Sequence, residues 1–426
     1  MVVTIVVLLI LAGVSISLVV DKNGIIQKSK DARREYGQAK ANEQEQMDNA
    51  NDWIEEATGK VTLAKVSVGT KASKNGTING EEGNSNNPTI PKNYIPIDTA
   101  TSTWGDGSSA PSQDSVKNGL VIKDEKNNEW VWVPVDSTTL ATMYEESSDE
   151  KTLCETTGET AVKTKLYSKS ITIGTDSNKT TIPRTTPGKP TYDKGCEPDL
   201  ATGQDTAERY YKDILGFDSK EKMAEAFVAD YNEMIASIGQ YGGFYIGRYE
   251  LSEAGVQKDK EPLTNTNWYN LYNACRNSKL QASDKVKTQM IWGCQWDVTL
   301  NWLISSGTKT SNEVNKDSSS WGNYYNTSVK ADDGTTEIKA SGTRAKLNTG
   351  KTTFTMANNI YDLVGNCDEW TQETVDVGNR ADRGGSFRNS GSDYPASYRS
   401  YGNIPSYDYQ DTDRFSSHFN NKVTSV

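Results

Sequence analysis

The first twenty residues, Met1–Val20, carry no charged side chain, and they constrain this chain more than any other stretch. An α-helix of about 20 predominantly apolar residues is long enough to cross the hydrocarbon core of a bilayer, which is roughly 30 Å thick. Only Thr4, Gly13, Ser15 and Ser17 interrupt the apolar run, so every face of the predicted helix is apolar. Such a helix must be surrounded by lipid or by other apolar helices.

Three interpretations of this segment are open. A cleaved secretory signal has a basic amino-terminal region and a shorter apolar core, and neither feature is present here. A simple membrane anchor fits the length. Assembly with copies of the same helix is the third interpretation, and residues 25–57 favour it, because they continue as a charged, helix-forming stretch after the polar break Asp21–Gly24. A solvated stalk that holds a domain away from a membrane is the alternative for residues 25–57.

Residues 1–60 resemble the amino-terminal stalk of type IV pilins, most specifically over residues 2–33, VVTIVVLLILAGVSISLVVDKNGIIQKSKDAR. The resemblance implies a helical homo-oligomer that is inserted in the membrane before assembly and then forms a filament at the cell surface. The glutamate that many pilins carry near the mature amino terminus has no counterpart here. The residues expected to pack in the filament core are Val2, Val3, Ile5, Val6, Val7, Leu8, Leu9, Ile10, Leu11, Val14, Ile16 and Leu18.

Composition limits the partners of the remaining chain. The 426 residues carry a formal net charge of −11, and we find no cluster of Lys and Arg that would suit the phosphates of nucleic acid. No nucleic-acid partner is therefore expected. The 10 Trp and 21 Tyr residues outnumber the 7 Phe residues. This amphipathic aromatic usage is typical of extracellular domains that bind or pack through polar rims.

The sequence predicts three parts. Residues 1–59 form the helical stalk, residues 60–117 form a strand and an Asn/Gly/Ser/Pro-rich linker, and residues 118–426 form a globular domain. A polar insertion at about 136–205 interrupts the domain. Cys154 and Cys196 bracket much of it and are a candidate disulfide, because the insertion has little to bury on its own. The five cysteines are odd in number, so at least one is not paired within the chain.

The sequence of the globular domain predicts an α+β fold with short strands, two or three helices and much irregular structure. Residues 118–135 predict a hairpin with a polar turn at Asp124–Asn128. Helices are predicted over residues 219–238, 268–276 and 292–304, and a further strand begins at Phe244.

Five motifs in order resemble the domain shared by formylglycine-generating enzyme and its relatives, which has a C-type-lectin-like fold. They are GGFYIGRYE, TNTNWYNLYNACRN, MIWGCQWDVTLNWL, NNIYDLVGNCDEWT and RGGSFRNSGSDYPASYRS, and the resemblance runs from about residue 118 to 420. The most specific pieces are residues 360–371 and 383–387. Without the family, Gly365–Asn366 predicts a tight turn, Trp370 a core anchor, and Gly384–Gly385 a close approach of backbones.

The same motifs argue against catalysis. The formylglycine-generating members oxidise a substrate cysteine with a copper-bound pair of cysteines a few residues beyond RGGS. No cysteine follows Arg383 in this chain. The related iron-dependent members need several histidines, and His418 is the only histidine here, which also excludes histidine-rich metal sites. We predict that the chain is not an enzyme.

A structural Ca²⁺ ion is the cofactor that the resemblance implies. Asp362, Gly365, Cys367 and Glu369 occupy the positions that coordinate calcium in the family, through two side chains and two backbone carbonyls. Hard oxygen ligands crowded into one turn suit this ion. The alternative is that Asp362 caps a turn and Glu369 lies at the surface.

The carboxyl-terminal stretch is rich in tyrosine, serine and asparagine, a mixture that gives contact area at low entropic cost. It is either a face for a glycan or protein ligand or a packing surface between subunits. Two functions therefore remain open: a filament subunit, and an anchored surface receptor or adhesin. The tyrosines concerned are Tyr394, Tyr398, Tyr401, Tyr407 and Tyr409.

Overall fold

A computed structural model divides the chain into two compact units, Met1–Thr62 and Leu63–Val426. In the first unit it describes only Glu35 and Ala39, both helical, so the predicted stalk and the assembly residues between Val2 and Leu18 lie outside the described residues. No described helix has the length and apolar character needed to cross a membrane. The other described residues are 63–143, 146–154, 162–167, 171–173, 180–182, 209–264, 266–284, 286–376, 379–403 and 423–425.

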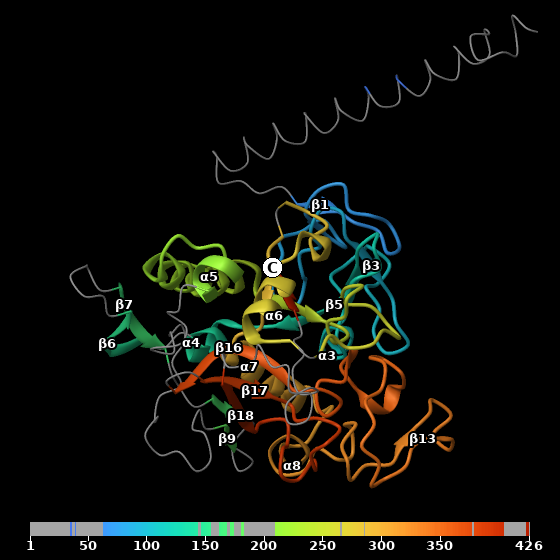
Figure 1. The fold of residues 1–426 in the computed structure, drawn as a ribbon. Helices are drawn as coiled ribbons and strands as arrows, with labels where there is room; N and C mark the ends of the chain where they lie inside the picture. Colours follow the sequence, from blue (N-terminus) through green and yellow to red (C-terminus); the bar gives the residue numbers. More distant parts are fainter. Residues whose placement is uncertain are drawn as a thin grey trace, which may run out of the picture. The chain divides into compact units, whose positions relative to one another are not determined.

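The largest sheet has six strands in the order β11, β19, β10, β5, β4 and β3, with every neighbouring pair antiparallel. Strands β5 and β3 of this sheet are labelled in Figure 1. The predicted hairpin is confirmed, since β4 and β5 pair with Val121 opposite Val131. The late strand β19 lies between β10 and β11. The strands are Thr288–Met290 (β11), Val423–Ser425 (β19), Gly243–Gly247 (β10), Glu129–Pro134 (β5), Val121–Lys123 (β4) and Ile95–Ile97 (β3).

The two faces of this sheet contribute to two hydrophobic clusters. Trp130 and Trp132 of β5 belong to the first cluster, whereas Val131 and Val133 belong to the second. Successive strand residues point to opposite faces, so this alternation means that both faces are covered. Burial on both sides explains why β5 is apolar at nearly every position, as buried strands are.

Three helices cover these faces, and they are the three that the sequence predicts. Helix α6 (Trp268–Cys275) contributes to the first cluster and α7 (Gly293–Ser305) to the second. Helix α5 (Lys220–Tyr241) is long enough to contribute to both. Helices and antiparallel strands together confirm the α+β class.

The ends of α5 follow from local chemistry. The Ser219 hydroxyl caps the amino terminus by accepting a hydrogen bond from the Lys222 amide at 3.3 Å. Gly242 ends the helix in the left-handed conformation with φ of 74°, and its amide donates to the Ile238 carbonyl at 2.9 Å. Of the two adjacent glycines at 242 and 243, Gly242 is therefore the residue that ends the helix.

The remaining elements are short, apart from a second, three-stranded sheet formed by β16 (Glu369–Asp376), β17 (Asn379–Arg383) and β18 (Arg399–Asn403). Among the described residues, the other α-helices are α3 (Gln113–Lys117), α4 (Ser137–Met143) and α8 (Ser311–Asn315), with a π-helix at Arg209–Ile214 and 3₁₀ turns at Ser278–Leu280 and Thr353–Thr355. The small strand pairs are β1 (Ala64–Lys65) with β2 (Gly76–Thr77), β6 (Glu146–Cys154) with β7 (Val162–Tyr167), β8 (Ile171–Ile173) with β9 (Thr180–Ile182), β12 (Val329–Lys330) with β13 (Glu337–Lys339), and β14 (Met356–Ala357) with β15 (Ile360–Tyr361).

Residues 63–117 are not the linker that their composition predicts, because they belong to the same compact unit as the rest of the domain. Ile78, Ile90, Tyr94 and Trp104 are fully buried in the first cluster. The Trp104 indole donates to the Val121 carbonyl at 2.8 Å. The many Asn, Gly and Ser residues form turns between a few large apolar side chains. These buried side chains, rather than the average composition, determine that the segment packs as part of the domain.

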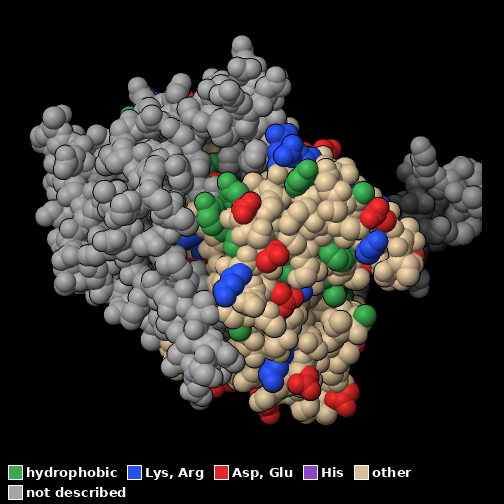
Figure 2. Space-filling view, turned by 90° about the horizontal axis from the view of Figure 1, so that it is seen from below, with side chains coloured by type: hydrophobic (Ala, Val, Ile, Leu, Met, Phe, Trp, Pro, Cys, Tyr) green, Lys and Arg blue, Asp and Glu red, His purple; other side chains and the backbone are tan. Residues whose placement is uncertain are grey.

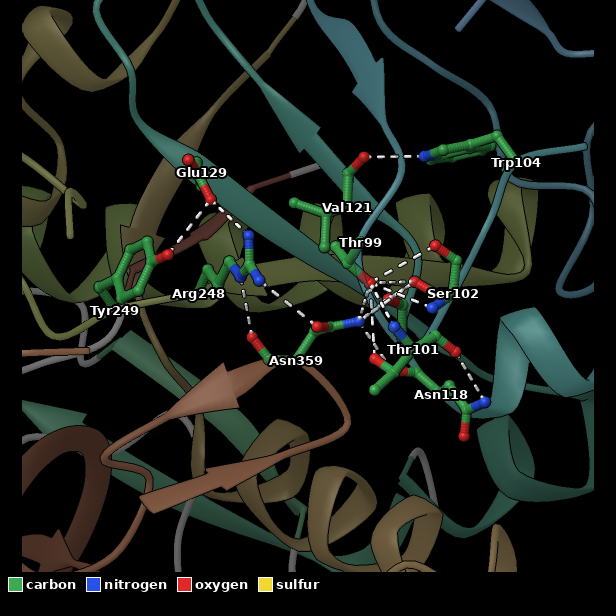
Figure 3. Close-up of polar contacts among 11 residues, drawn as sticks. Thr99, Thr101, Ser102, Trp104, Asn118, Val121, Glu129, Arg248, Tyr249 and Asn359 are labelled. Carbon is green, nitrogen blue, oxygen red and sulfur yellow. Dashed lines mark hydrogen bonds and ion pairs between the residues drawn. The ribbon is translucent and has the colours of Figure 1, made fainter. Parts of the chain in front are cut away.

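Asn359 joins this amino-terminal segment to the rest of the domain (Figure 3). Its side-chain nitrogen Nδ2 lies 2.8 Å from the Gly119 carbonyl and 3.1 Å from the Ser102 hydroxyl. On the other side, Arg248 Nε donates to the Asn359 carbonyl at 3.2 Å and Arg248 Nη1 pairs with Glu129 at 2.7 Å. Through these contacts, Asn359 links residues 102–119 to Arg248 and, through Arg248, to β5.

The polar insertion contains α4 and two hairpins, of strands β6 with β7 and β8 with β9. Cys154 is the last residue of β6, but its side chain and the whole of Cys196 lie outside the described part, so their disulfide stays a prediction. Cys275, Cys294 and Cys367 are buried in the domain.

Candidate metal-binding turn and its acidic surroundings

The segment between β15 and β16 forms the tight turn that Gly365–Asn366 predicts. Gly365 has φ of 68° and Asn366 has φ of 58°. A Cβ atom at position 365 would lie 2.6 Å from the backbone nitrogen of Asn323, so only glycine fits there. The Gly365 amide donates to the Gly384 carbonyl at 3.0 Å, and the Asn366 amide donates to the Asn323 carbonyl at 2.9 Å. The turn therefore fixes the RGGSF segment to the loop at residue 323.

Glu250 supports this turn from beneath, and the sequence prediction did not single it out. Its carboxylate is fully buried and accepts from Asn366 Nδ2 at 2.6 Å and from the Cys367 amide at 3.1 Å. Asn366 Oδ1 accepts in turn from Asn323 Nδ2 at 2.9 Å and from the Leu347 amide at 2.8 Å. One feature of the sequence could have identified Glu250. It is the carboxylate at the end of the GGFYIGRYE motif, directly after a strand that is fully buried.

The four predicted calcium ligands lie within residues 362–369, and all of them are buried. Asp362 has φ of 52°, and its Oδ2 accepts from the Gly350 amide at 2.7 Å and from the Thr349 hydroxyl at 3.2 Å. Asp362 thus caps a turn as the alternative expected. The other half of that alternative is wrong, because Glu369 is not at the surface.

The Glu369 carboxylate lies close to the backbone of Gly384. A Cβ atom on Gly384 would lie 2.7 Å from both Glu369 Oε2 and the Leu363 carbonyl oxygen, so these two oxygens converge on the Gly384 backbone. Buried carboxylate and carbonyl oxygens are the donor types that Ca²⁺ takes, and the residues present fit that ion in chemistry. Calcium binding by Asp362, Gly365, Cys367 and Glu369 stays a prediction.

A pair of buried aspartates lies beside the turn. Asp368 is 3% exposed and Asp382 of β17 is 4% exposed. Burial raises the pKa of Asp368 well above its usual range, and the charge of Asp382 raises it further, while a hydrogen bond from Ser386 acts in the opposite direction. Among the described residues, no three His, Cys, Asp or Glu side chains form a group that could hold a metal ion.

Two buried ion pairs stabilise the second sheet, one to helix α7 and one within the sheet. Arg383 of β17 pairs with Asp297 of α7, and Arg399 of β18 pairs with Glu373 of β16. All four side chains are nearly or fully inaccessible. Removing one partner of such a pair leaves a buried charge uncompensated, which costs about 3–5 kcal/mol. Arg383, at the end of β17, and Arg399, at the start of β18, therefore have structural roles.

Two of the buried cysteines, Cys275 and Cys367, are poor nucleophiles. Burial raises the pKa of the Cys367 thiol well above its usual range, and the charge of Glu250 raises it further. Burial likewise raises the pKa of Cys275. The reactive form of cysteine is the thiolate, so both side chains stay in the unreactive thiol form at neutral pH.

The predicted tyrosine face is described only in part. Tyr394 and Tyr398 are half-buried, and their ring centroids lie 4.8 Å apart. The Tyr324 hydroxyl lies 2.6 Å from the Gly384 carbonyl and 2.9 Å from the Tyr394 carbonyl, so it can donate to either, and it links this loop to the RGGSF turn. Tyr401 lies in β18 with its side chain outside the described part, and residues 407 and 409 also lie outside it.

Comparisons with protein-family models, with curated proteins and with solved structures find no match for this chain.

Proposed function

We propose that this chain is a structural subunit of an extracellular, type IV pilus-like filament. In this proposal the apolar helix packs with its copies in the filament core, and a C-type-lectin-like domain without catalytic activity lies on the outside. The observation that carries it is the division of the chain between Thr62 and Leu63, because the most apolar segment belongs to a different unit from the domain.

The energy of the apolar segment supports this proposal. Leaving the twelve predicted assembly residues in water would cost on the order of 20 kcal/mol, since each buried aliphatic side chain is worth about 1.5–3 kcal/mol. A typical domain is stable by only about 5–15 kcal/mol. The segment therefore needs a partner surface in every state of the protein, first lipid and then copies of itself.

The contacts of Arg383 and of the buried cysteines support a non-catalytic role for the domain. Arg383 is used in a buried ion pair, and the thiols of Cys275 and Cys367 stay protonated. A domain of this kind offers a stable surface rather than reactive groups.

The second candidate is a membrane-anchored receptor or adhesin that binds a glycan or protein, and the half-buried Tyr394–Tyr398 pair favours it. On the described part of the face in Figure 2, acidic and basic side chains are interspersed and hydrophobic side chains form small separate groups. A ligand on that face would therefore make mainly polar contacts.

The decisive experiment is electron microscopy of negatively stained material shed from cells that express the full chain. We expect fibres from the wild type and from the control Leu9→Ile, which keeps an apolar side chain of equal volume. Leu9→Arg should abolish fibres, because an arginine at the centre of an apolar helix costs about 2.5–3.5 kcal/mol even on lenient scales. Immunoblots of the membrane fraction should detect all three proteins.

Fibres that persist in Leu9→Arg would refute assembly through the apolar helix. Wild-type protein that is recovered only as detergent-solubilised monomers would favour the anchored receptor instead.

A further inference from the structure

Lys339, the last residue of β13, has a buried side chain whose ammonium group is surrounded by backbone carbonyls. Its Nζ atom donates to the carbonyls of Tyr324 and Thr327, each at 2.7 Å, and to that of Thr343 at 3.3 Å. An ammonium group has three N–H donors and no acceptor, so the three carbonyls match its donors one for one. These carbonyls therefore form a cage of oxygens around one positive charge.

The charge in this carbonyl cage is compensated without an ion pair. No carboxylate in the described part of the chain pairs with the Lys339 ammonium group, and Glu337, the acid nearest in sequence, pairs with Lys330 at 3.8 Å. Burial lowers the pKa of Lys339, because the ammonium group loses its hydration, while the charge of Glu337 acts in the opposite direction. The groups that replace the lost water are carbonyl dipoles, as they are for K⁺ in a channel selectivity filter.

The carbonyl cage fixes a loop that carries an exposed aromatic side chain. The Tyr325 carbonyl accepts from the Gly342 amide at 2.8 Å, and the Asn326 carbonyl accepts from the Ser341 hydroxyl at 3.0 Å. All four carbonyls of residues 324–327 therefore have donors, and the first and last share the same ammonium group. Tyr325 itself is 37% exposed. The charge of the lysine thus holds both ends of the segment that presents this ring.

We propose that the carbonyl cage is a binding site for a primary ammonium ion, that Lys339 is its built-in occupant, and that a free alkylammonium ion takes the site when this side chain is shortened. Distances of 2.7–3.3 Å suit N–H donors, whereas Ca²⁺ takes its oxygen ligands at about 2.3–2.6 Å and prefers carboxylates. Ile338 is half-buried and Ala340 is exposed, so the space left by a shorter side chain lies close to solvent. The site shares no residue with the predicted calcium ligands, and it does not depend on filament assembly.

The test is chemical rescue of Lys339→Ala, measured as the melting temperature of the full chain in detergent with a chelator in every sample. Propylammonium is the probe, because it is the fragment that the substitution removes, and the variant is purified in its presence. After exchange into tetramethylammonium chloride, whose cation has no N–H group, Lys339→Ala should melt about 5 °C below the wild type, since buried carbonyls lose their donors. Propylammonium chloride at the same ionic strength should restore about half of this loss or more.

Three controls separate a cation site from a filled cavity. Lys339→Met keeps the length of the side chain without its charge, so it should also melt low and should not respond to propylammonium. Lys330→Ala removes a lysine that is 38% exposed on β12, and it should melt like the wild type in both salts. Propanol, which has the shape of the probe without its charge, should not rescue Lys339→Ala.

Three results would overturn the proposal. The first is a Lys339→Ala protein that melts like the wild type without propylammonium. The second is a variant that propylammonium does not restore, including one that fails to fold in its presence. The third is equal rescue by propanol, which would show that the missing volume matters and the missing charge does not.

Discussion

Replacing Asn359 by aspartate tests whether residues 63–119 are held as part of the domain. The side-chain nitrogen of Asn359 lies within 2.8–3.1 Å of the Gly119 and Asn118 carbonyls and of the Thr99 and Ser102 hydroxyls. An amide has two hydrogens, so it makes about two well-directed bonds among these four acceptors. Asn359→Asp keeps the size of the side chain, removes both donors, and turns a carboxylate toward two carbonyl oxygens.

The expected loss is about 3 kcal/mol in the free energy of unfolding. Each buried polar group that loses its partner costs about 1–3 kcal/mol. Arg248 offsets part of the new charge, because its Nη2 lies 3.4 Å from Asn359 Oδ1. The remaining loss is a large fraction of the 5–15 kcal/mol that stabilises a typical domain.

Asn118→Asp is the matched control. Asn118 Nδ2 also donates to a backbone carbonyl, that of Thr101 at 2.9 Å, but this bond is exposed to solvent. Its removal should cost less than about 1 kcal/mol, even with a negative charge at the end of α3. Both variants leave residues 1–62 unchanged, so any contribution of that segment cancels in the comparison.

The measurement is urea unfolding of the detergent-solubilised chain, followed by tryptophan fluorescence. Hydrogen exchange of the amides in residues 99–119 gives the location of the effect, and only Asn359→Asp should accelerate it. Equal destabilisation by the two variants, or an Asn359→Asp protein within about 0.5 kcal/mol of the wild type, would refute the reasoning.

Two further predictions concern the turn and the core. If calcium holds the turn, a chelator should lower the melting temperature of the wild type by a few degrees. Asp362→Ala should melt at the same temperature with and without chelator. The control Asp393→Ala, at an exposed position, should keep the effect of the chelator. A wild-type melting temperature that does not change with chelator would exclude the site. Because burial raises the pKa of Cys275 above that of the unfolded chain, its contribution to stability is complete below the usual thiol pKa and is lost as the pH rises toward the folded value. Mass spectrometry should find Cys275 unmodified by iodoacetamide at about pH 9 in the native chain and modified in urea, and rapid labelling without urea would contradict its burial.

The sequence predicted the regular elements where the signal is local. Helix α5 extends only three residues past its predicted end, and the hairpin of β4 and β5 has the predicted turn. These elements follow from spacing, from the Ser219 cap and from the left-handed Gly242, all of which act within a few residues of chain. Helices α3, α4 and α8 were not predicted, because five to seven residues hold too little of a period to be recognised.

The linker prediction failed for a physical reason. The average composition of residues 75–115 is dominated by Asn, Gly and Ser. Whether this segment packs against the domain depends instead on the positions of a few large apolar residues such as Tyr94 and Trp104, which are fully buried. The acceptors that Asn359 satisfies lie some 240 positions or more earlier in the chain. No local pattern contains such a pairing.

By itself, the sequence determined that residues 1–20 need an apolar environment and that the chain turns at Gly365–Asn366. It also determined that no cysteine follows the RGGSF segment in the printed sequence. Each of these statements depends on residue type alone. Only the tertiary structure decided that Glu250 supports that turn, that Asp362 caps the 349–350 segment, and that α3 and α7 face each other across a groove. Glu250 and Cys367 are 117 positions apart, and α3 and α7 are also distant in sequence, so no local pattern contains these contacts and only tertiary packing sets them.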